Sequence, residues 1–204
     1  MGATGLVGRQ VLAQALSDPR ISTVVAPVRQ TLPQHPKLLA PHIDYERLPD
    51  TAPWWQVDAA ICTLGTTMKR AGSRAAFRRV DHDYPLAVAR LVRARGTATY
   101  VLNSAIGADA QSRFFYNRVK GELELALAQE GFDSLTFVRP GVIGGQRGEF
   151  RLGERMLATG LALAGPLLAR RWRLNPAPTI AHALLCAALA SVPGQHIVPA
   201  DRLV

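Results

Sequence analysis

The chain has 204 residues, of which 48% are hydrophobic, and its formal net charge is +9 at pH 7. This length suits a single α/β domain with a substantial core, and the apolar content excludes an intrinsically disordered chain. The longest apolar stretch, residues 156–169, is interrupted by Pro166 and is shorter than the roughly 20 residues of a membrane span. With no signal peptide at its start, the chain is expected to be cytoplasmic.

Short β-rich runs alternate with longer helical runs, which is typical of βα units around a parallel sheet. In chain order, the pattern predicts a helix over 8–16, strands over 23–28, near 42–45 and over 58–64, a helix over 74–94, a strand over 100–103, a helix over 114–130 and a strand over 134–139. Helical apolar stretches follow at 150–168 and 179–190, and a last strand lies near 196–198. We expect one domain over residues 1–204, with residues 146–204 forming a small region on the substrate side.

The positive charge raises the question of nucleic acid binding. Only three of the basic residues are lysines, and the 21 arginines are scattered, with one short cluster at residues 170–173. Charge without a recognisable site is weak evidence for such a partner. We treat nucleic acid as a minor alternative and attribute part of the charge to attraction for an anionic cofactor or substrate.

The cysteines and histidines do not indicate a metal site. Cys62 and Cys186 both lie in apolar runs, which predicts two buried, reduced thiols rather than a disulfide. The five histidines show no metal-ligand spacing. We therefore expect no metal.

A glycine-rich turn opens the chain. Residues 2–8 read Gly-Ala-Thr-Gly-Leu-Val-Gly and run directly into the first predicted helix. Glycines let the backbone turn tightly and approach a pyrophosphate, while the N–H groups and dipole of the following helix attract the anion. The pattern predicts a site for the phosphates of a dinucleotide.

The strand that should precede this turn is missing. A doubly wound fold places its first strand in the middle of the sheet, directly before the glycine turn, yet only Met1 precedes Gly2. Two explanations are open: an N-terminally shortened chain, or a protein that tolerates the gap. In the second case cofactor binding should be impaired, because the strand positions the turn.

Tyr116 and Lys120 are four residues apart in a predicted helix and therefore share one face. The pKa of a free tyrosine is about 10, and a neighbouring ammonium lowers it, which makes the phenol a usable general acid or base. A surface Tyr–Lys pair would have the same spacing. Ser104 favours the catalytic interpretation, because it follows a predicted strand at the carboxyl edge of the sheet, where ligands bind.

Taken in order, these segments resemble an atypical short-chain dehydrogenase/reductase, and more narrowly the Tat-interacting-protein-like oxidoreductase branch. The resemblance covers roughly residues 2–145 and rests on the glycine turn, residues 62–67 (Cys-Thr-Leu-Gly-Thr-Thr), residues 80–84 (Val-Asp-His-Asp-Tyr), Ser104, residues 116–122 and residues 138–141 (Val-Arg-Pro-Gly). It implies a doubly wound parallel sheet, the Rossmann fold. By position, Ser104 would orient the substrate, Tyr116 would donate or accept the proton, and Lys120 would hold the nicotinamide ribose and tune Tyr116.

The same resemblance implies a set of cofactor-binding residues. The glycine turn would hold the pyrophosphate, the segment after the strand over 58–64 would line the stretch from adenosine to nicotinamide, and the segment near 140 would lie beside the nicotinamide. In full, the set is Gly2, Thr4, Gly5, Leu6, Val7, Gly8, Leu64, Gly65, Thr66, Tyr116, Lys120, Pro140 and Val142. The C-terminal third matches the pattern weakly, so the substrate pocket is not readable.

Arg29 predicts a preference for NADP(H) over NAD(H). It follows the second predicted strand, where NAD-specific folds carry an acidic residue, and residues 21–43 contain no Asp or Glu. A guanidinium matches a phosphate with a bidentate fork, so Arg29 and Arg9 would suit a 2′-phosphate. The alternative is a solvated arginine after a strand.

We therefore expect an NADP(H)-dependent oxidoreductase that moves a hydride to or from a small carbonyl or alcohol substrate. The sequence leaves the oligomeric state open. The alternative is a non-catalytic NADP(H)-sensing regulatory protein that binds a protein partner.

Overall fold

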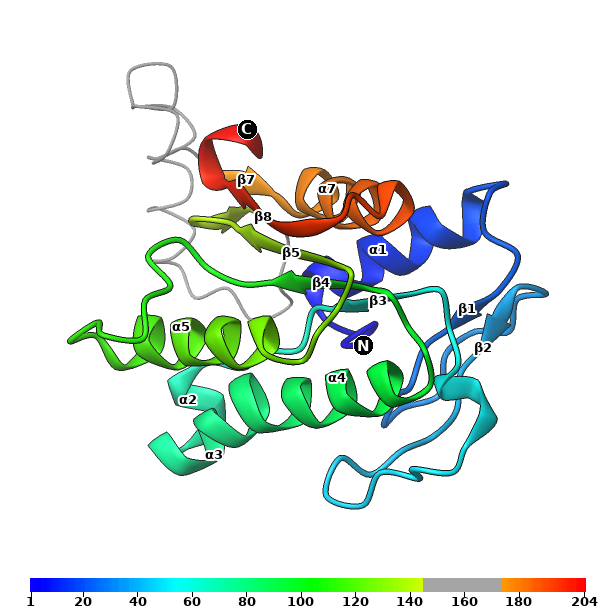
Figure 1. The fold of residues 1–204 in the computed structure, drawn as a ribbon, viewed down its shortest axis with the longest axis horizontal. Coiled ribbons are helices and arrows are strands. Elements are labelled where there is room, and N and C mark those ends of the chain that lie inside the picture. The colour runs from blue at the N-terminus through cyan, green and yellow to red at the C-terminus, as the bar shows by residue number, and fades with distance from the viewer. Residues whose placement is uncertain (145–173) are drawn as a thin grey trace.

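The structure is a computed structural model that describes residues 1–144 and 174–204. Its main sheet has four parallel strands in the order β3-β4-β5-β8, with bounds Ala59–Cys62, Thr99–Asn103, Ser134–Arg139 and Gly194–Pro199 (Figure 1). All three pairings are parallel and in continuous register, for example Tyr100 opposite Leu135. The predicted parallel α/β sheet is therefore confirmed.

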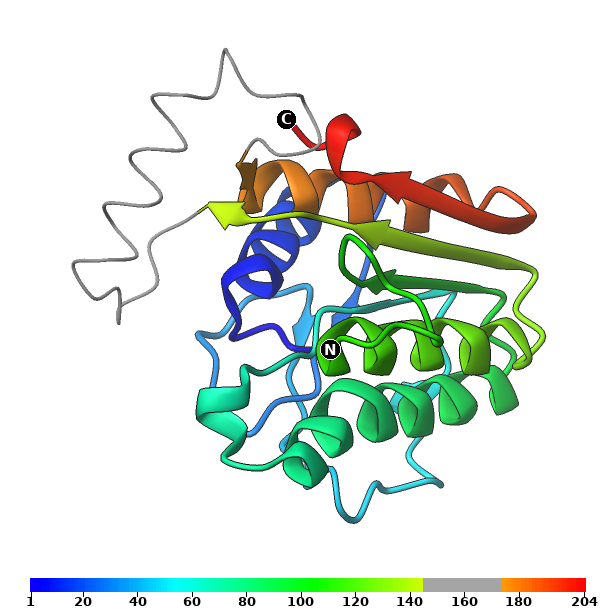
Figure 2. The ribbon, with the colours of Figure 1, turned by 90° about the vertical axis from the view of Figure 1, so that its left-hand side faces the viewer.

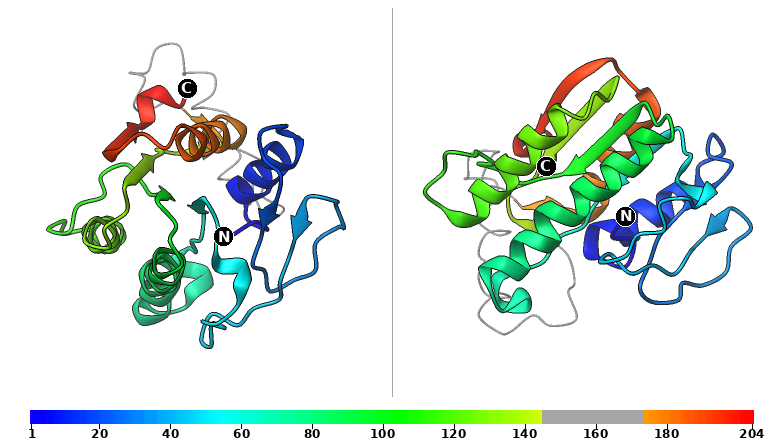
Figure 3. Two further views of the ribbon diagram at one scale, coloured as in Figure 1. Left: turned by 45° about the vertical axis from the view of Figure 1, so that its right-hand side comes forward. Right: turned by 60° about the horizontal axis from the view of Figure 1, so that its bottom comes forward.

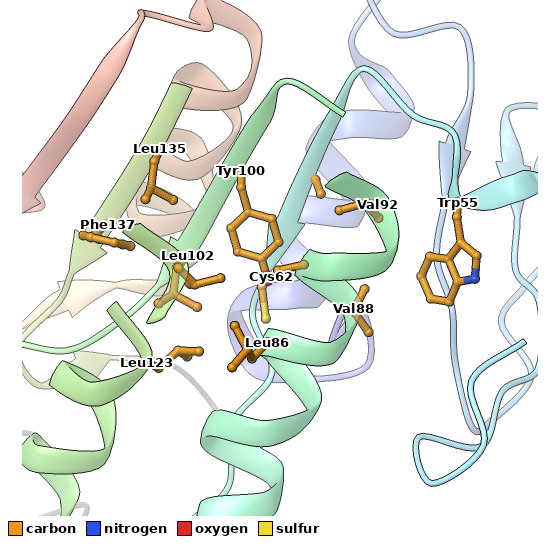
Figure 4. Packing of buried hydrophobic residues seen from close by; sticks show 13 residues of the cluster. Trp55, Cys62, Leu86, Val88, Val92, Tyr100, Leu102, Leu123, Leu135 and Phe137 are labelled. Carbon is orange, nitrogen blue, oxygen red and sulfur yellow. The ribbon is translucent and has the colours of Figure 1, made fainter. Parts of the chain in front are cut away.

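Helices cover both faces of this sheet. Figure 2 shows α1 (Leu6–Ser17) and α7 (Ala177–Ala190) on one side, and α4 (Tyr84–Ala94) and α5 (Phe115–Ala128) on the other. Strand side chains alternate between the two layers. Tyr100 and Leu102 belong to the α4/α5 core drawn in Figure 4, while Val101 between them packs with α7.

The sheet is interrupted beside β3. Strand β1 (Val24–Val25) pairs in parallel with β2 (Leu38–Leu39) as a separate two-stranded sheet. A third apolar cluster, which includes Ala26, Val28 and Leu12, packs this pair against α1. Figure 3 shows the N-terminus between β1 and β3, at the place where the sequence predicts a missing central strand.

The shorter elements complete the described chain. They are α2 (Met68–Ala71), α3 (Arg74–Arg78), β6 (Ile143–Gly144), β7 (Asn175–Pro176) and 3₁₀ turns over Pro53–Trp55 and Ala200–Arg202. Strands β6 and β7 pair in parallel. No helix within residues 1–144 and 174–204 has the length and apolar character needed to cross a bilayer.

The predicted helix over 74–94 is in fact broken by a π-helical turn over Arg79–Asp83. The Tyr84 N–H donates to the Arg79 carbonyl, five residues back. Pro85 explains the break, because proline has no N–H and its ring would clash with the Asp81 carbonyl in a regular helix.

Other expectations also need correction. The predicted strand over 23–28 shortens to Val24–Val25, and the one near 42–45 is reduced to two isolated bridges, Val28 with His42 and Asp44 with Arg47. Cys62 is buried as expected, but Cys186 is exposed. Helix α7 is apolar on most of its circumference, so periodicity did not tell which side would be buried. The predicted helical stretch at 150–168 lies outside the described residues.

Candidate active site

The glycine turn lies between the end of β3 and the start of α1. The Met1 carbonyl accepts hydrogen bonds from the Thr63 N–H at 3.1 Å and from the Thr63 hydroxyl at 2.9 Å, and the Gly5 N–H donates to the Gly2 carbonyl at 2.9 Å. Helix α1 then begins at Leu6 with no side-chain cap and no acidic residue in its first turn. The N–H groups and the positive dipole end of such an uncapped helix start are suited to an anion.

Close backbone approach explains the glycines at positions 2 and 8. Gly2 has a φ of +77°, in the left-handed region that favours glycine. A Cβ on Gly8 would collide with the carbonyl group of Gly2, so α1 packs directly on the turn. Backbone N–H donors at an uncapped helix start, without side chains in the way, fit the pyrophosphate of a dinucleotide.

A buried ion pair joins the predicted catalytic lysine to the predicted cofactor loop. The Lys120 Nζ on α5 lies 2.8 Å from Asp81 Oδ1, and the two side chains are 4% and 1% exposed. Asp81 Oδ2 accepts a hydrogen bond from the Thr66 N–H at 2.7 Å. Gly65 lies over the pair, because a Cβ there would be 3.3 Å from Asp81 Oδ1. One carboxylate thus fixes both the loop after β3 and the Lys120 side chain.

Tyr116 lies one turn before Lys120 on α5, and its side chain is 41% exposed. Its ring meets the Phe77 ring edge-on, with centroids 5.8 Å apart. Burial by itself lowers the pKa of the Lys120 ammonium, but the charge of Asp81, followed by that of Tyr116, outweighs it and raises the pKa above its ordinary value. Lys120 is therefore a permanent cation at neutral pH, which is what lowering the pKa of a neighbouring phenol requires.

Ser104 is buried at the carboxyl end of β4, in a second ionic network. Its hydroxyl donates to Glu124 Oε1 at 2.5 Å. Glu124, on α5, also pairs with Arg139 at the end of β5, and the Arg139 Nε donates to the same oxygen at 3.0 Å. This hydrogen bond raises the pKa of Arg139. Helix α5 therefore carries Tyr116 and Lys120 and also fixes Ser104.

Asn175 holds the segment that follows β5. Its Oδ1 accepts from the Gly141 N–H at 2.7 Å, and its own N–H donates to the Val142 carbonyl at 2.9 Å. The Pro140 carbonyl accepts from the Ile106 N–H at 2.8 Å, which ties this segment to the loop after β4. The side chain of Val142 is 50% exposed. Pro140 and Val142 therefore lie next to the loop that begins with Ser104.

The structure gathers most of the predicted site residues at one edge of the sheet. The glycine turn lies against the end of β3, the loop with Gly65 lies next to Lys120, and Ser104 is hydrogen-bonded to Glu124 of α5. Arg29 is exposed after β1, where its carbonyl oxygen lies 2.9 Å from His42 Nε2, and its contact with a 2′-phosphate stays a prediction.

Two buried residues of this arrangement, Glu124 and Asn175, were not singled out from the sequence, and Asp81 was quoted within residues 80–84 without a role. The available signal was a charged or amide residue inside an apolar segment. Glu124, for example, lies between Leu123 and Leu125 on a predicted helix. That signal was indistinct, because such residues also occur on the solvated side of amphipathic helices.

Comparison with known proteins identifies close relatives. The chain is 33% identical over 214 residues to "Protein FMP52, mitochondrial" of Coccidioides immitis, covering 95% of this chain and 86% of the relative. It is 38% identical over 159 residues to "Protein HTATIP2" of Rattus norvegicus, covering 76% of this chain and 65% of the relative. The chain belongs to the FMP52 and HTATIP2 family. The motif-based assignment to the Tat-interacting-protein-like branch of atypical short-chain dehydrogenases/reductases is therefore confirmed, although no family model matches the chain.

Solved structures with the same fold include several that hold a nicotinamide dinucleotide. MoeE5 in complex with UDP-glucose and NAD superposes with a TM-score of 0.70 at 16% identity, covering 96% of this chain and 73% of that one. RMD from Pseudomonas aeruginosa complexed with NADPH gives a TM-score of 0.65 at 19% identity, covering 98% and 76%. At these identities the likeness shows the fold alone, and that fold is the Rossmann arrangement of NAD(P)-binding proteins.

The expected cytoplasmic location is contradicted by the same comparison. Relatives from Coccidioides immitis, Emericella nidulans and Candida albicans carry the word mitochondrial in their names. The expectation rested on the lack of a recognisable secretory signal, and such a lack does not identify a compartment.

Proposed function

We propose that this chain is an NADP(H)-dependent oxidoreductase that acts on a carbonyl or alcohol substrate at Ser104, Tyr116 and Lys120. The observation that carries the proposal is the buried Lys120–Asp81 pair, because it fixes a permanent cation one helical turn from Tyr116 and against the loop that contains Gly65. When bound, the nicotinamide would supply or accept the hydride. The N–H groups at the start of α1 would hold the pyrophosphate, and Pro140 and Val142 would lie beside the nicotinamide.

Tyr116 transfers the proton in this proposal. When a carbonyl is reduced, the Tyr116 hydroxyl gives its proton to the substrate oxygen, and when an alcohol is oxidised the phenolate takes that proton back. The Lys120 ammonium stabilises the phenolate and so brings the pKa of Tyr116 closer to neutrality. Tyr116 as a whole is 41% exposed, so this part of α5 lies at the surface of the described structure.

Ser104 positions the substrate through its oxygen. The Ser104 hydrogen is directed to Glu124, so the hydroxyl offers its lone pairs to a ligand. Those lone pairs can accept a hydrogen bond from an alcohol. To donate to a carbonyl, the Ser104 hydroxyl must first turn away from Glu124.

The experiment compares NADPH binding by calorimetry with NADPH-dependent turnover over a panel of carbonyl compounds. Tyr116→Phe is expected to lower turnover by at least about 100-fold, the usual contribution of a general acid, while the NADPH Kd changes by less than about threefold. Tyr84→Phe is the matched control, because the Tyr84 hydroxyl donates to Glu46 at the surface. Unchanged turnover in Tyr116→Phe would contradict the proposal, and tight NADPH binding by an inactive wild type would favour the NADP(H)-sensing alternative.

A further inference from the structure

Two buried side-chain oxygens lack a hydrogen-bond partner within residues 1–144 and 174–204: Asn103 Oδ1 and the Ser134 hydroxyl oxygen. Such atoms are uncommon, because a buried polar atom that has lost its contact with water needs another partner. The Ser134 hydroxyl can rotate and can both donate and accept, whereas the Asn103 carboxamide oxygen only accepts. Asn103 therefore offers an acceptor that the described part of the chain does not use.

Asn175 shows how the same residue type is used for structure. Its Oδ1 accepts a hydrogen bond from the Gly141 N–H at 2.7 Å, and its Nδ2 donates to the Ala200 carbonyl at 2.9 Å. Asn175 is fully buried, and its amide joins the two segments that it contacts. Within the described ranges Asn103 Oδ1 makes no link of this kind, so the packing of the chain does not account for an acceptor at this position.

Asn103 is the last residue of β4, at the carboxyl edge of the sheet, where ligands of parallel sheets bind. Side chains of a strand alternate between its faces, and Val101, two residues earlier, packs in one cluster with Val7 of α1 and with α7. Asn103 lies opposite Val138 of β5, which belongs to the same cluster. The Asn103 side chain is therefore on the α1/α7 face, where the helix after the glycine turn begins.

The neighbours of Asn103 on both sides lead to predicted cofactor segments. Strands β3 and β4 are in register to the end of β3, and continuing this register places Thr63 beside Asn103. The Thr63 N–H and hydroxyl hold the glycine turn through the Met1 carbonyl. On the other side, the Ile106 N–H donates to the Pro140 carbonyl at 2.8 Å. Asn103 thus lies between the glycine turn and the segment at Pro140.

The donors that would reach this place follow from the proposed function, on which this inference rests. There the glycine turn holds the pyrophosphate, and Pro140 and Val142 lie beside the nicotinamide. The nicotinamide nucleoside connects these two positions, and its ribose hydroxyls and carboxamide N–H₂ are hydrogen-bond donors. The adenosine half would extend in the opposite direction, toward Arg29 after β1. Only the nicotinamide half would therefore bring donors to the end of β4.

We propose that Asn103 Oδ1 is a binding group for the nicotinamide nucleoside half of NADP(H), accepting a hydrogen bond from its ribose or its carboxamide. Asn103 would act from the α1/α7 face of the sheet, whereas Tyr116 and Lys120 act from α5 on the other face. The bound coenzyme would give the buried oxygen a partner, so the contact would stabilise the complex and not the unliganded protein.

The experiment measures the Kd values of NADP⁺ and of 2′,5′-ADP by calorimetry, for the wild type and for Asn103→Leu. Leucine has the branched shape of asparagine but no acceptor. The NADP⁺ Kd is expected to rise by at least about 10-fold, because a donor of the coenzyme is left unpaired. The Kd of 2′,5′-ADP, which lacks the nicotinamide nucleoside, should change by less than about twofold. Asn103→Ala, which adds no bulk, should give the same pattern.

Ser134→Ala is the matched control. It removes the other unpaired oxygen of the described residues, which lies on the same face of the sheet but at the amino end of β5. Both Kd values should stay unchanged in this variant. Without ligand, Tm should not fall in Asn103→Leu, since no hydrogen bond of Oδ1 is broken. A fall in Tm together with equal weakening of both ligands would give Asn103 a structural role and overturn the proposal.

The 3-acetylpyridine analogue of NADP⁺, which has no carboxamide N–H₂, identifies the donor. If the ribose donates, Asn103→Leu should weaken binding of the analogue as much as binding of NADP⁺. If the carboxamide donates, the variant should bind the analogue like the wild type. Unchanged NADP⁺ binding in Asn103→Leu would overturn this inference and leave the proposed function intact, whereas a wild type that binds neither NADP⁺ nor 2′,5′-ADP would overturn both.

Discussion

Both oxygens of the Asp81 carboxylate are engaged, one by the Lys120 ammonium and the other by the Thr66 N–H. At the scale of single residues, this carboxylate connects the loop after β3 with the helix that carries Tyr116. Asp81 and Lys120 are both buried, so the negative charge of Asp81 offsets the cost of burying the Lys120 ammonium. The same residue therefore serves stability and the geometry of the site.

Asp81→Asn is expected to lower the free energy of unfolding at pH 7 by about 3–5 kcal/mol, the usual cost of breaking a buried ion pair. Urea denaturation measures this loss. The exposed pair of Arg90 with Glu130 is the matched control, and Glu130→Gln should cost no more than about 1 kcal/mol. Similar losses in the two variants would contradict the role of burial.

The penalty of Asp81→Asn should also depend on pH. The pKa of Lys120 is raised in the folded protein, so the stabilisation by the pair is complete below the ordinary pKa of 10.5 and is lost as the pH rises through the folded value. In the variant, the largest opposition to burial is gone and the weaker effect of Tyr116 remains, so the pKa of Lys120 falls below its wild-type value and Lys120 loses its charge earlier. Denaturation midpoints from pH 7 upward should therefore converge between the two proteins, and a constant difference would contradict this assignment.

The candidate site was partly predictable at this scale. Tyr116, Lys120 and Ser104 were predicted as site residues because their residue types and spacing match a known order of motifs, and their catalytic roles stay predictions. Glu124 and Arg139 were not, because their importance comes from pairing across α5 and β5, which spacing along the chain does not reveal.

At the scale of elements, α5 matters most, because it presents Tyr116, Lys120 and Glu124 together. Its position is set by Gly121, where a Cβ would collide with the backbone of Asp109 and Ala110. The helix therefore packs directly against the loop that follows Ser104. A displaced α5 would separate the groups that the site brings together.

Gly121→Ala is expected to destabilise the protein by about 1–3 kcal/mol through overpacking, and to lower turnover because α5 shifts. Denaturation and steady-state kinetics measure the two effects. Gly144→Ala is the control, since a Cβ there would meet its nearest neighbour, Leu174, at an ordinary 3.7 Å. Wild-type stability and turnover in Gly121→Ala would contradict the claim that Gly121 sets the position of α5.

Elements were predictable where one residue pattern dominates. Strand β5 has the predicted bounds, Ser134–Arg139, because an apolar and β-branched run is closed by Pro140. The π-helical turn was not predicted, because the sequence around Pro85 is otherwise helical and only the packing decides between a kink and a wider turn. Strand β2 was missed because Leu38–Leu39 is too short to show alternation.

At the scale of the whole molecule, cofactor binding should appear as added stability. NADPH at about 100 times its Kd should raise the free energy of unfolding by about 2.7 kcal/mol and Tm by roughly 5–10 °C. Calorimetry with NADPH and with NADH gives the two Kd values, and their ratio measures the preference for NADPH. Arg29→Ala should remove most of the difference between the two, whereas Arg202→Ala, in the 3₁₀ turn near the C-terminus, should preserve it. An unchanged preference in Arg29→Ala would assign the 2′-phosphate to other residues.

The strands β1 and β2 form one small sheet, and β3, β4, β5 and β8 form a separate, larger one. The small sheet packs on α1 through the cluster that contains Ala26 and Val28. Ser104 follows β4 of the large sheet, and Tyr116 lies on α5, which packs on that sheet. Under the proposed function, a dinucleotide that reaches from Arg29 to Tyr116 would contact both sheets and so link them across the gap between β1 and β3. The coenzyme would then also hold the two sheets together, and the motion of one sheet relative to the other would decrease when the coenzyme binds.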